Sequence, residues 1–200
     1  MTSLALKSAY GLKILSNKHK AIHKIREQAN IPEIYGDKIW CSSYFIMDHF
    51  LKNPITQKSK VIEIGCGSGI LSIFCTKEFD SKVIGVDADS NVIPFLQVHA
   101  KKNEMKIKTK VCRYENLKPK LLAGQDLIVG GDICFWDELV EPLFKLIRLA
   151  MRQQIGKIII ADLGRTPFLK LAKCCQKKYK AELIPVSTRK KDGCLLVING

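Results

Sequence analysis

Residues 61–74 constrain the fold more strongly than any other stretch of the chain. They begin with a short apolar run at 61–64, pass through alternating glycines at 65, 67 and 69, and continue with apolar residues at helical spacing. A strand, a tight glycine turn and the start of a helix place free backbone N–H groups and the positive end of a helix dipole at the carboxyl end of a parallel strand. The sequence therefore predicts an α/β fold with a nucleotide-sized binding site at this turn.

The spacing of these glycines separates two kinds of cofactor site. A dinucleotide fingerprint has its third glycine five positions after the first, and Ile70 stands there instead. An acid, Glu63, lies two residues before Gly65, which gives the pattern acidic-x-Gly-x-Gly-x-Gly. This pattern resembles motif I of the class I S-adenosylmethionine-dependent methyltransferases. The resemblance implies that Gly65 and Gly67 approach the methionine part of S-adenosyl-L-methionine and that Glu63 anchors its ammonium, directly or through water.

Three further residues are placed where such a cofactor has its sugar and its base. Asp87 ends a β-rich run and follows Gly65 by 22 residues, where a doubly wound fold places the carboxylate that binds two ribose hydroxyls. Tyr114 follows the next predicted strand, so its ring can lie on the adenine face. Trp40 precedes a predicted helix at 44–51, and its position suits either the core or stacking on a flat ligand.

The length and the order of apolar segments predict one domain over residues 1–200, with an N-terminal helical extension at 1–54 and a core at 55–200, and the resemblance implies that this is a methyltransferase domain whose core is catalytic. Strands and helices alternate through the core, which predicts a Rossmann-like, doubly wound, mostly parallel seven-stranded sheet with helices on both faces. Two strands at 182–186 and 194–198, joined by a basic turn, predict a C-terminal antiparallel hairpin. An intermittent apolar stripe predicts a helix over 4–29, although Gly11 weakens that interpretation.

The cysteines and the apolar runs bear on location and metal binding. The chain has 8 cysteines, and none forms a C-x-x-C pair or lies at metal-ligand spacing from a histidine. Reduced thiols in the cytoplasm are the simplest interpretation, and no metal site is expected. No run approaches the roughly 18 apolar residues of a membrane span, and the first residues lack the features of a secretory signal.

The net charge favours acidic partners. Lysine and arginine number 33 against 19 acidic residues, which gives 33 − 19 = +14 and a pI near 9.5. Such a surface attracts nucleic acid, an anionic membrane or an acidic protein. The lysines are scattered through the whole chain, however, so a general compositional bias explains them equally well. The sequence leaves the oligomeric state open.

Two loops indicate which class of methyltransferase the chain resembles. The segment 131–139 after the fourth predicted strand and the segment 161–168 after the fifth, together with 38–40, are similar to the seven-β-strand protein-lysine methyltransferases. The chain resembles most the electron-transfer-flavoprotein β-subunit lysine methyltransferase family, over about residues 40–168. This resemblance implies S-adenosyl-L-methionine as cofactor and a protein substrate. The cofactor-binding residues that it implies are Trp40, Glu63, Gly65, Cys66, Gly67, Asp87, Ala88, Tyr114 and Gly131.

The same resemblance implies a catalytic group at the acceptor mouth. Asp132 would orient the lysine ammonium and help it lose a proton, while Phe135 and Trp136 would wall the aliphatic stem of the lysine. The family usually has a tyrosine at the position of Phe135, and the segment 163–167 departs from its usual proline placement. Both departures concern the substrate rather than the cofactor. An aspartate that only caps the next turn is the plain alternative for Asp132.

Other functions remain open at this level. The basic surface favours an RNA methyltransferase, but the loop after the fourth predicted strand lacks the Asn/Asp-Pro-Pro-aromatic sequence that stacks and methylates a base nitrogen. A small-molecule methyltransferase is a second alternative. A cofactor-binding protein without turnover is a third, and the intact glycines together with Asp132 argue against it.

Overall fold

A computed structural model describes residues 6–28, 32, 36, 38–188 and 191–200. Its main sheet is built from strands β3 (Lys60–Ile64), β4 (Lys82–Asp87), β5 (Lys108–Val111), β6 (Leu127–Gly131), β7 (Lys157–Asp162), β8 (Ala181–Ser187) and β9 (Asp192–Asn199). The spatial order is β5-β4-β3-β6-β7-β9-β8. Strand β3 is parallel to both β4 and β6, whereas β9 runs antiparallel to β7 and β8. The predicted mostly parallel seven-stranded sheet with its C-terminal hairpin is confirmed.

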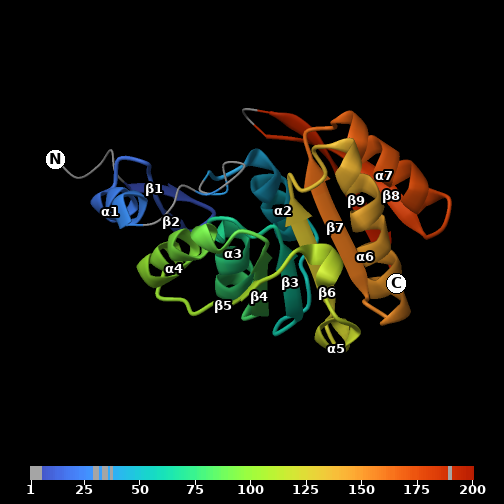
Figure 1. Cartoon of the computed structure of the whole chain (residues 1–200), viewed down its shortest axis with the longest axis horizontal. Helices are drawn as coiled ribbons and strands as arrows, with labels where there is room; N and C mark the ends of the chain where they lie inside the picture. The colour runs from blue at the N-terminus through green and yellow to red at the C-terminus, as the bar shows by residue number, and fades with distance from the viewer. Residues whose placement is uncertain (1–5, 29–31, 33–35, 37, 189–190) are drawn as a thin grey trace.

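Helices cover both faces of this sheet (Figure 1). They are α2 (Cys41–Lys52), α3 (Ile70–Phe79), α4 (Ile93–Lys102), α5 (Pro119–Leu122), α6 (Val140–Arg152) and α7 (Thr166–Gln176), with short 3-10 turns η2 (Ser90–Val92), η3 (Tyr114–Asn116) and η4 (Asp137–Leu139). None of the helices in the described ranges is long and apolar enough to cross a membrane.

The central strand β3 shows how one sheet supports two apolar cores. Val61 packs into the cluster formed with α2, α3 and α4, while Ile62 and Ile64 pack into the cluster formed with α6 and α7. Successive side chains of a strand point to opposite faces, so a strand with helices on both sides is mostly apolar, and the buried Glu63 is the exception in β3. The chain runs outward from β3 through β4 to β5, then returns to β6 on the other side. The loops after β3 and β6 therefore separate, and they leave a crevice at the carboxyl ends of the strands.

The predicted helix over 4–29 is wrong in its first half. Strands β1 (Leu6–Ala9) and β2 (Leu12–Leu15) form an antiparallel hairpin, and helix α1 begins only at Lys20 and ends at Gln28. Tyr10 and Gly11 both have positive φ, 53° and 70°, as a two-residue hairpin turn of type I′ requires. The leucines at helical spacing predict a helix, but the segment also has the alternating pattern of a strand, in which Leu12 and Ile14 are buried and Lys13 is exposed.

The hairpin is attached to the helices of one sheet face by polar contacts. The Asn103 side chain accepts a hydrogen bond from Lys13 N at 2.8 Å and donates one to Lys13 O at 2.9 Å, as a neighbouring strand would. The Tyr10 hydroxyl donates to Asp48 Oδ1 at 2.8 Å. The hairpin thus packs beside α2, α3 and α4, and the N-terminal extension is a hairpin followed by a helix.

Candidate active site

A cavity of about 460 Å³ opens at the carboxyl ends of the central strands. This volume lies within the range of small-molecule sites, which is roughly 300–1,000 Å³. Most of the predicted site residues lie on its wall, namely Trp40, Gly65, Gly67, Asp87, Ala88, Tyr114, Gly131, Asp132 and Phe135. Residues that the sequence reasoning did not select also line it, among them Gly36, Ser90, Val92 and Ile133.

Three predicted residues lie off the cavity wall. Glu63 is only 3% exposed, and its Oε2 accepts hydrogen bonds from the Ser72 backbone N–H at 2.8 Å and from the Ser72 hydroxyl. Cys66 is buried, and its backbone N–H donates to Val86 O at 3.1 Å. Trp136 is 54% exposed and packs edge-on against Phe135, with ring centroids 4.7 Å apart. Glu63 and Cys66 therefore lie behind the glycine turn, on the side away from the cavity. Trp136 lies outside the cavity, next to the lining residue Phe135.

The glycine turn needs glycine for two physical reasons. Gly65 and Gly67 have φ of 65° and 48°, a conformation that costs other residues strain. A Cβ at Gly65 would also overlap the Ile133 side chain, and one at Gly67 would lie 2.9 Å from Gly36 O. The turn is therefore closely covered on two sides, and its remaining face borders the cavity.

Asp87 connects the end of β4 to this turn. Its Oδ2 accepts a hydrogen bond from Gly67 N at 2.9 Å, and its Oδ1 accepts one from Asp89 N at 3.0 Å. Burial raises the pKa of Asp87, and these backbone hydrogen bonds lower it. Each carboxylate oxygen keeps acceptor capacity beyond these bonds, so the side chain can also bind ligand hydroxyl groups.

Tyr114 supplies an unsatisfied polar atom on the cavity wall. Its hydroxyl oxygen is buried and has no hydrogen-bond partner within the described residues. Burial raises the pKa of this hydroxyl, so it is a neutral donor at physiological pH. Buried hydroxyl groups nearly always have a partner, so this one favours a ligand that completes the site.

Asp132 is the acid at the β6 end of the cavity. It has a positive φ of 57°, and its backbone N–H donates to Ala161 O at 2.9 Å. The Ser42 hydroxyl donates to one carboxylate oxygen, and the Arg165 guanidinium donates to the other. Burial raises the pKa of Asp132, whereas the Ser42 hydrogen bond and the Arg165 charge lower it. The sequence marked the loop that contains Arg165, but it gave no signal for this pairing or for Ser42.

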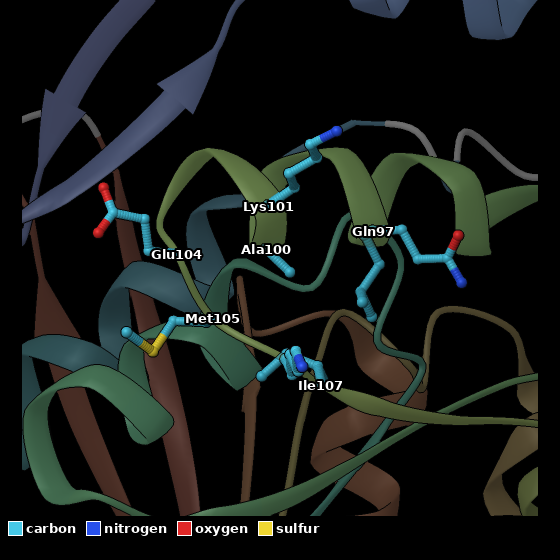
Figure 2. A pocket seen from close by; sticks show the side chains of 8 residues that line it. Gln97, Ala100, Lys101, Glu104, Met105 and Ile107 are labelled. Atoms are coloured by element: carbon cyan, nitrogen blue, oxygen red, sulfur yellow. The ribbon is translucent and has the colours of Figure 1, made fainter.

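A second hollow of about 460 Å³ lies beside α4 and the segment that follows it. Figure 2 shows its lining side chains, including Met105, Ile107 and Lys101. It contains none of the predicted site residues, and its charged side chains, Lys101, Glu104 and Lys106, are exposed. The cavity beside the glycine turn is therefore the candidate active site.

The cysteines are free thiols: Cys66, Cys75, Cys134 and Cys175 are buried, Cys41, Cys112 and Cys194 are half-buried, and Cys174 is exposed. Burial raises the pKa of the Cys66 and Cys75 thiols well above the ordinary value, so both are uncharged. Within the described ranges, no group of three or more histidine, cysteine or acidic side chains is arranged to hold a metal ion.

The comparisons with known proteins identify the family. A family model described as lysine methyltransferase matches residues 18–167. The chain belongs to this family. It is 29% identical over 144 residues to the electron transfer flavoprotein beta subunit lysine methyltransferase of Xenopus laevis, covering 68% of this chain and 58% of the relative. It is 43% identical over 129 residues to the ubiquinone biosynthesis O-methyltransferase of Pelagibacter ubique, covering 64% and 52%. The chain thus spans little more than half the length of these relatives.

Solved structures support the fold. The TrmN structure from Thermus thermophilus aligns with a TM-score of 0.64 at 15% identity, covering 78% of this chain and 48% of that one. The TrmK structure from M. capricolum, in complex with S-adenosyl-homocysteine, aligns with a TM-score of 0.58 at 14% identity, covering 76% and 66%. Likenesses at such low identity show the fold alone. Membership of the lysine methyltransferase family implies S-adenosylmethionine as the cofactor, and the glycine turn, Asp87 and the unsatisfied Tyr114 hydroxyl fit such a ligand.

Proposed function

We propose that the protein is an S-adenosylmethionine-dependent methyltransferase that methylates a lysine side chain of a protein. The observation that carries the proposal is the Asp132 carboxylate on the cavity wall, at the β6 end, with Phe135 beside it. The family description and the relative that acts on an electron transfer flavoprotein subunit both support lysine as the acceptor.

On the cofactor side, the backbone of Gly65 and Gly67 would face the methionine part, and Asp87 would bind the ribose hydroxyls. Tyr114 and Trp40 would flank the flat parts of the ligand, and Ala88 and Gly131, which also line the cavity, would complete the wall. Glu63 and Cys66 act from beneath the turn. The cofactor supplies a methyl group on a positively charged sulfur.

On the acceptor side, Asp132 would pair with the lysine ammonium, orient it and accept the proton that it loses before it reacts. With the cofactor bound, the neutral nitrogen would form the new bond to the methyl carbon as the carbon–sulfur bond breaks and its electron pair goes to sulfur. Such a reaction depends mainly on position and on the exclusion of water. Phe135 would pack against the aliphatic stem of the lysine, and this surface is apolar because phenylalanine lacks the hydroxyl of the tyrosine that is usual in the family. Trp136 extends the wall at the rim.

Labelled S-adenosylmethionine distinguishes the acceptor classes. The purified protein is incubated with the label and either a total protein and RNA extract or the electron transfer flavoprotein β subunit, and the products are treated with protease or RNase. We expect protease-sensitive label, with methyl groups on lysine after hydrolysis. RNase-sensitive label would replace this proposal with an RNA methyltransferase, and label in small metabolites would indicate a small-molecule acceptor.

The substitution Asp132→Asn tests the acceptor site itself. An amide has nearly the same shape as the carboxylate but carries no charge, so we expect turnover to fall about 100-fold or more. Affinity for S-adenosylhomocysteine, measured by calorimetry, is expected to stay within about twofold, since a twofold change is less than 0.5 kcal/mol. Asp137→Asn is the matched control, because Asp137 is an exposed acid of the same loop that pairs with Lys170 at 2.8 Å. Full activity of Asp132→Asn would show that this aspartate is only a turn cap.

A further inference from the structure

A second loop reaches the acceptor end of the cavity. It follows β7 and begins with Asp162, whose Oδ1 accepts hydrogen bonds from Gly164 N at 2.9 Å and Arg165 N at 2.8 Å. Gly164 has a φ of 89°, which lets the chain turn back at once. Asp162 thus folds the loop so that the Arg165 side chain returns towards β6 and Asp132.

The Arg165 guanidinium lies between two carboxylates. Its Nε donates to both oxygens of Asp162, at 3.2 and 3.0 Å, and its Nη2 donates to Asp162 Oδ2 and to Asp132 Oδ1. The side chains of Asp132 and Asp162 are only 5% and 1% exposed. Guanidinium groups hold carboxylates through paired N–H donors in a fixed plane, so this arrangement fixes direction as well as charge.

The charges of this cluster do not cancel. Two carboxylates share one guanidinium, which leaves a surplus of one negative charge in a place shielded from water. If Arg165 faced Asp132 alone, the pair would be neutral and would offer little attraction to a cationic acceptor. Because Asp162 also neutralises Arg165, the charge of Asp132 remains available to an incoming ammonium.

Other elements complete the support of Asp132. Ser42, in the first turn of α2, donates its hydroxyl to Asp132 Oδ2, the oxygen that Arg165 does not contact. Cys134 faces Asp162 and Arg165 from the loop after β6, and burial raises its pKa to about 12, so it stays a neutral thiol. Asp132 itself holds a left-handed backbone conformation with a φ of 57°, which persists only where the surroundings fix it.

We infer that Arg165 and Asp162 are positioning residues that orient the Asp132 carboxylate towards the acceptor amine and set the negative charge at that place. This inference rests on the proposed function, because it takes Asp132 as the group that meets the acceptor. Neither residue touches the methyl donor in this scheme, and both act through Asp132.

The test compares Arg165→Gln, Arg165→Lys and Asp162→Asn with the wild type. The acceptor probe is the electron transfer flavoprotein β subunit, or the extract protein that takes up the label if that subunit does not. Asp162→Asn cancels the surplus charge, so we expect KM for the acceptor to rise about tenfold while the cofactor affinity stays within about twofold. Arg165→Gln is expected to lower kcat about tenfold or more, and Arg165→Lys to restore part of it, because an ammonium keeps the charge but not the bridging geometry.

The pH dependence adds a readout that a purely structural role would not give. Arg165 lowers the pKa of Asp132, so its removal raises that pKa. The limb of the pH–rate curve that reports protonation of Asp132 is therefore expected to move to higher pH in Arg165→Gln and to return towards the wild-type position in Arg165→Lys. Lys170→Gln is the matched control, since it removes a nearby cation that pairs with the exposed Asp137 at 2.8 Å.

The outcomes separate this inference from the proposed function. If Asp132→Asn abolishes turnover while Arg165→Gln and Asp162→Asn keep wild-type KM, kcat and pH dependence, the positioning role is overturned and the proposed function stands. If Asp132→Asn is fully active, the proposed function itself fails. Loss of cofactor affinity and of thermal stability in every variant, with no rescue by Arg165→Lys, would indicate a structural role only. If Arg165→Gln does not fold, Arg165→Lys and Asp162→Asn decide the question through the same kcat and KM values.

Discussion

Gly67 lies between the cavity and the backbone of Gly36, so the chain has little space at this position. Its φ is 48°, and a Cβ there would lie 2.9 Å from Gly36 O. We expect Gly67→Ala to weaken S-adenosylhomocysteine binding about tenfold or more in calorimetry, because the turn must shift to relieve the contact. Gly124→Ala is the matched control: Gly124 has a φ of 71°, but nothing lies within 4 Å of the added Cβ. Equal affinities in the two variants would refute this account of the turn.

Glu63 makes the stability of the protein depend on pH. Burial raises its pKa to about 8 from an ordinary value of 4.5, against the Ser72 hydrogen bonds that lower it. The folded protein therefore keeps a proton that the unfolded chain releases, and the stabilisation is fully present below about pH 4.5 and is lost as the pH rises to about 8. Glu63→Gln does not titrate, so its Tm is expected to fall less than that of the wild type across this range. Glu141→Gln, which changes an exposed acid paired with Lys145 at 3.7 Å, serves as control and is expected to follow the wild type. Parallel Tm curves for Glu63→Gln and the wild type would contradict the assignment.

At the scale of elements, the N-terminal hairpin depends on one side chain of another element. Asn103 is buried and supplies both hydrogen bonds to the Lys13 backbone. Asn103→Ala leaves these backbone groups unpaired, which costs about 1–3 kcal/mol. We expect a lower Tm and faster hydrogen exchange at residues 6–15, with cofactor affinity unchanged. Lys102→Ala, at the exposed neighbouring position of α4, is the control. Unchanged exchange in Asn103→Ala would show that apolar packing alone holds the hairpin.

The elements of the core could be predicted from the sequence, and the hairpin could not. Buried strands such as β3 are nearly continuous apolar runs bounded by glycine or polar residues, and such runs are compatible with few other structures. The terminal strands were predicted at 182–186 and 194–198 and extend over 181–187 and 192–199. In the hairpin, each strand has only four residues, and the leucines of β2 also fit helical spacing with the isoleucines of α1. The residues therefore fit a helix and a hairpin equally well. The hairpin is favoured by contacts with Asp48 and Asn103, which are distant in the sequence.

At the scale of the whole molecule, the residues of the candidate site are brought together by strand pairing. Asp132 and Arg165 are separated by 33 positions, and Ser42 and Asp132 by 90. They meet because β6 and β7 pair in parallel, with Gly131 opposite Ala161, so that both following loops leave the same edge of the sheet. A sequence motif can mark each loop, but the pairing of their charges depends on the register of the sheet. The cofactor turn is different, because its strand, turn and helix are contiguous, and its glycines could be selected from the sequence.

The net charge of +14 gives a last prediction for the molecule as a whole. Two of the positive charges lie at the open edge of the sheet, where Lys108 and Lys110 of β5 are exposed. If the acceptor is an acidic protein, its attraction weakens as the Debye length falls from about 10 Å at 0.1 M salt to about 3 Å at 1 M. We therefore expect KM for such an acceptor to rise with salt while kcat stays constant, since the proposed site of methyl transfer lies inside the cavity. Exchange of Lys108 and Lys110 for glutamate is expected to raise KM at low salt and to weaken the dependence of KM on salt. The control is the same exchange at the exposed Lys173 and Lys177, which changes the net charge equally but at the α7 end of the molecule. We expect this control to have the smaller effect. A KM that is independent of salt would show that the basic surface does not guide the acceptor.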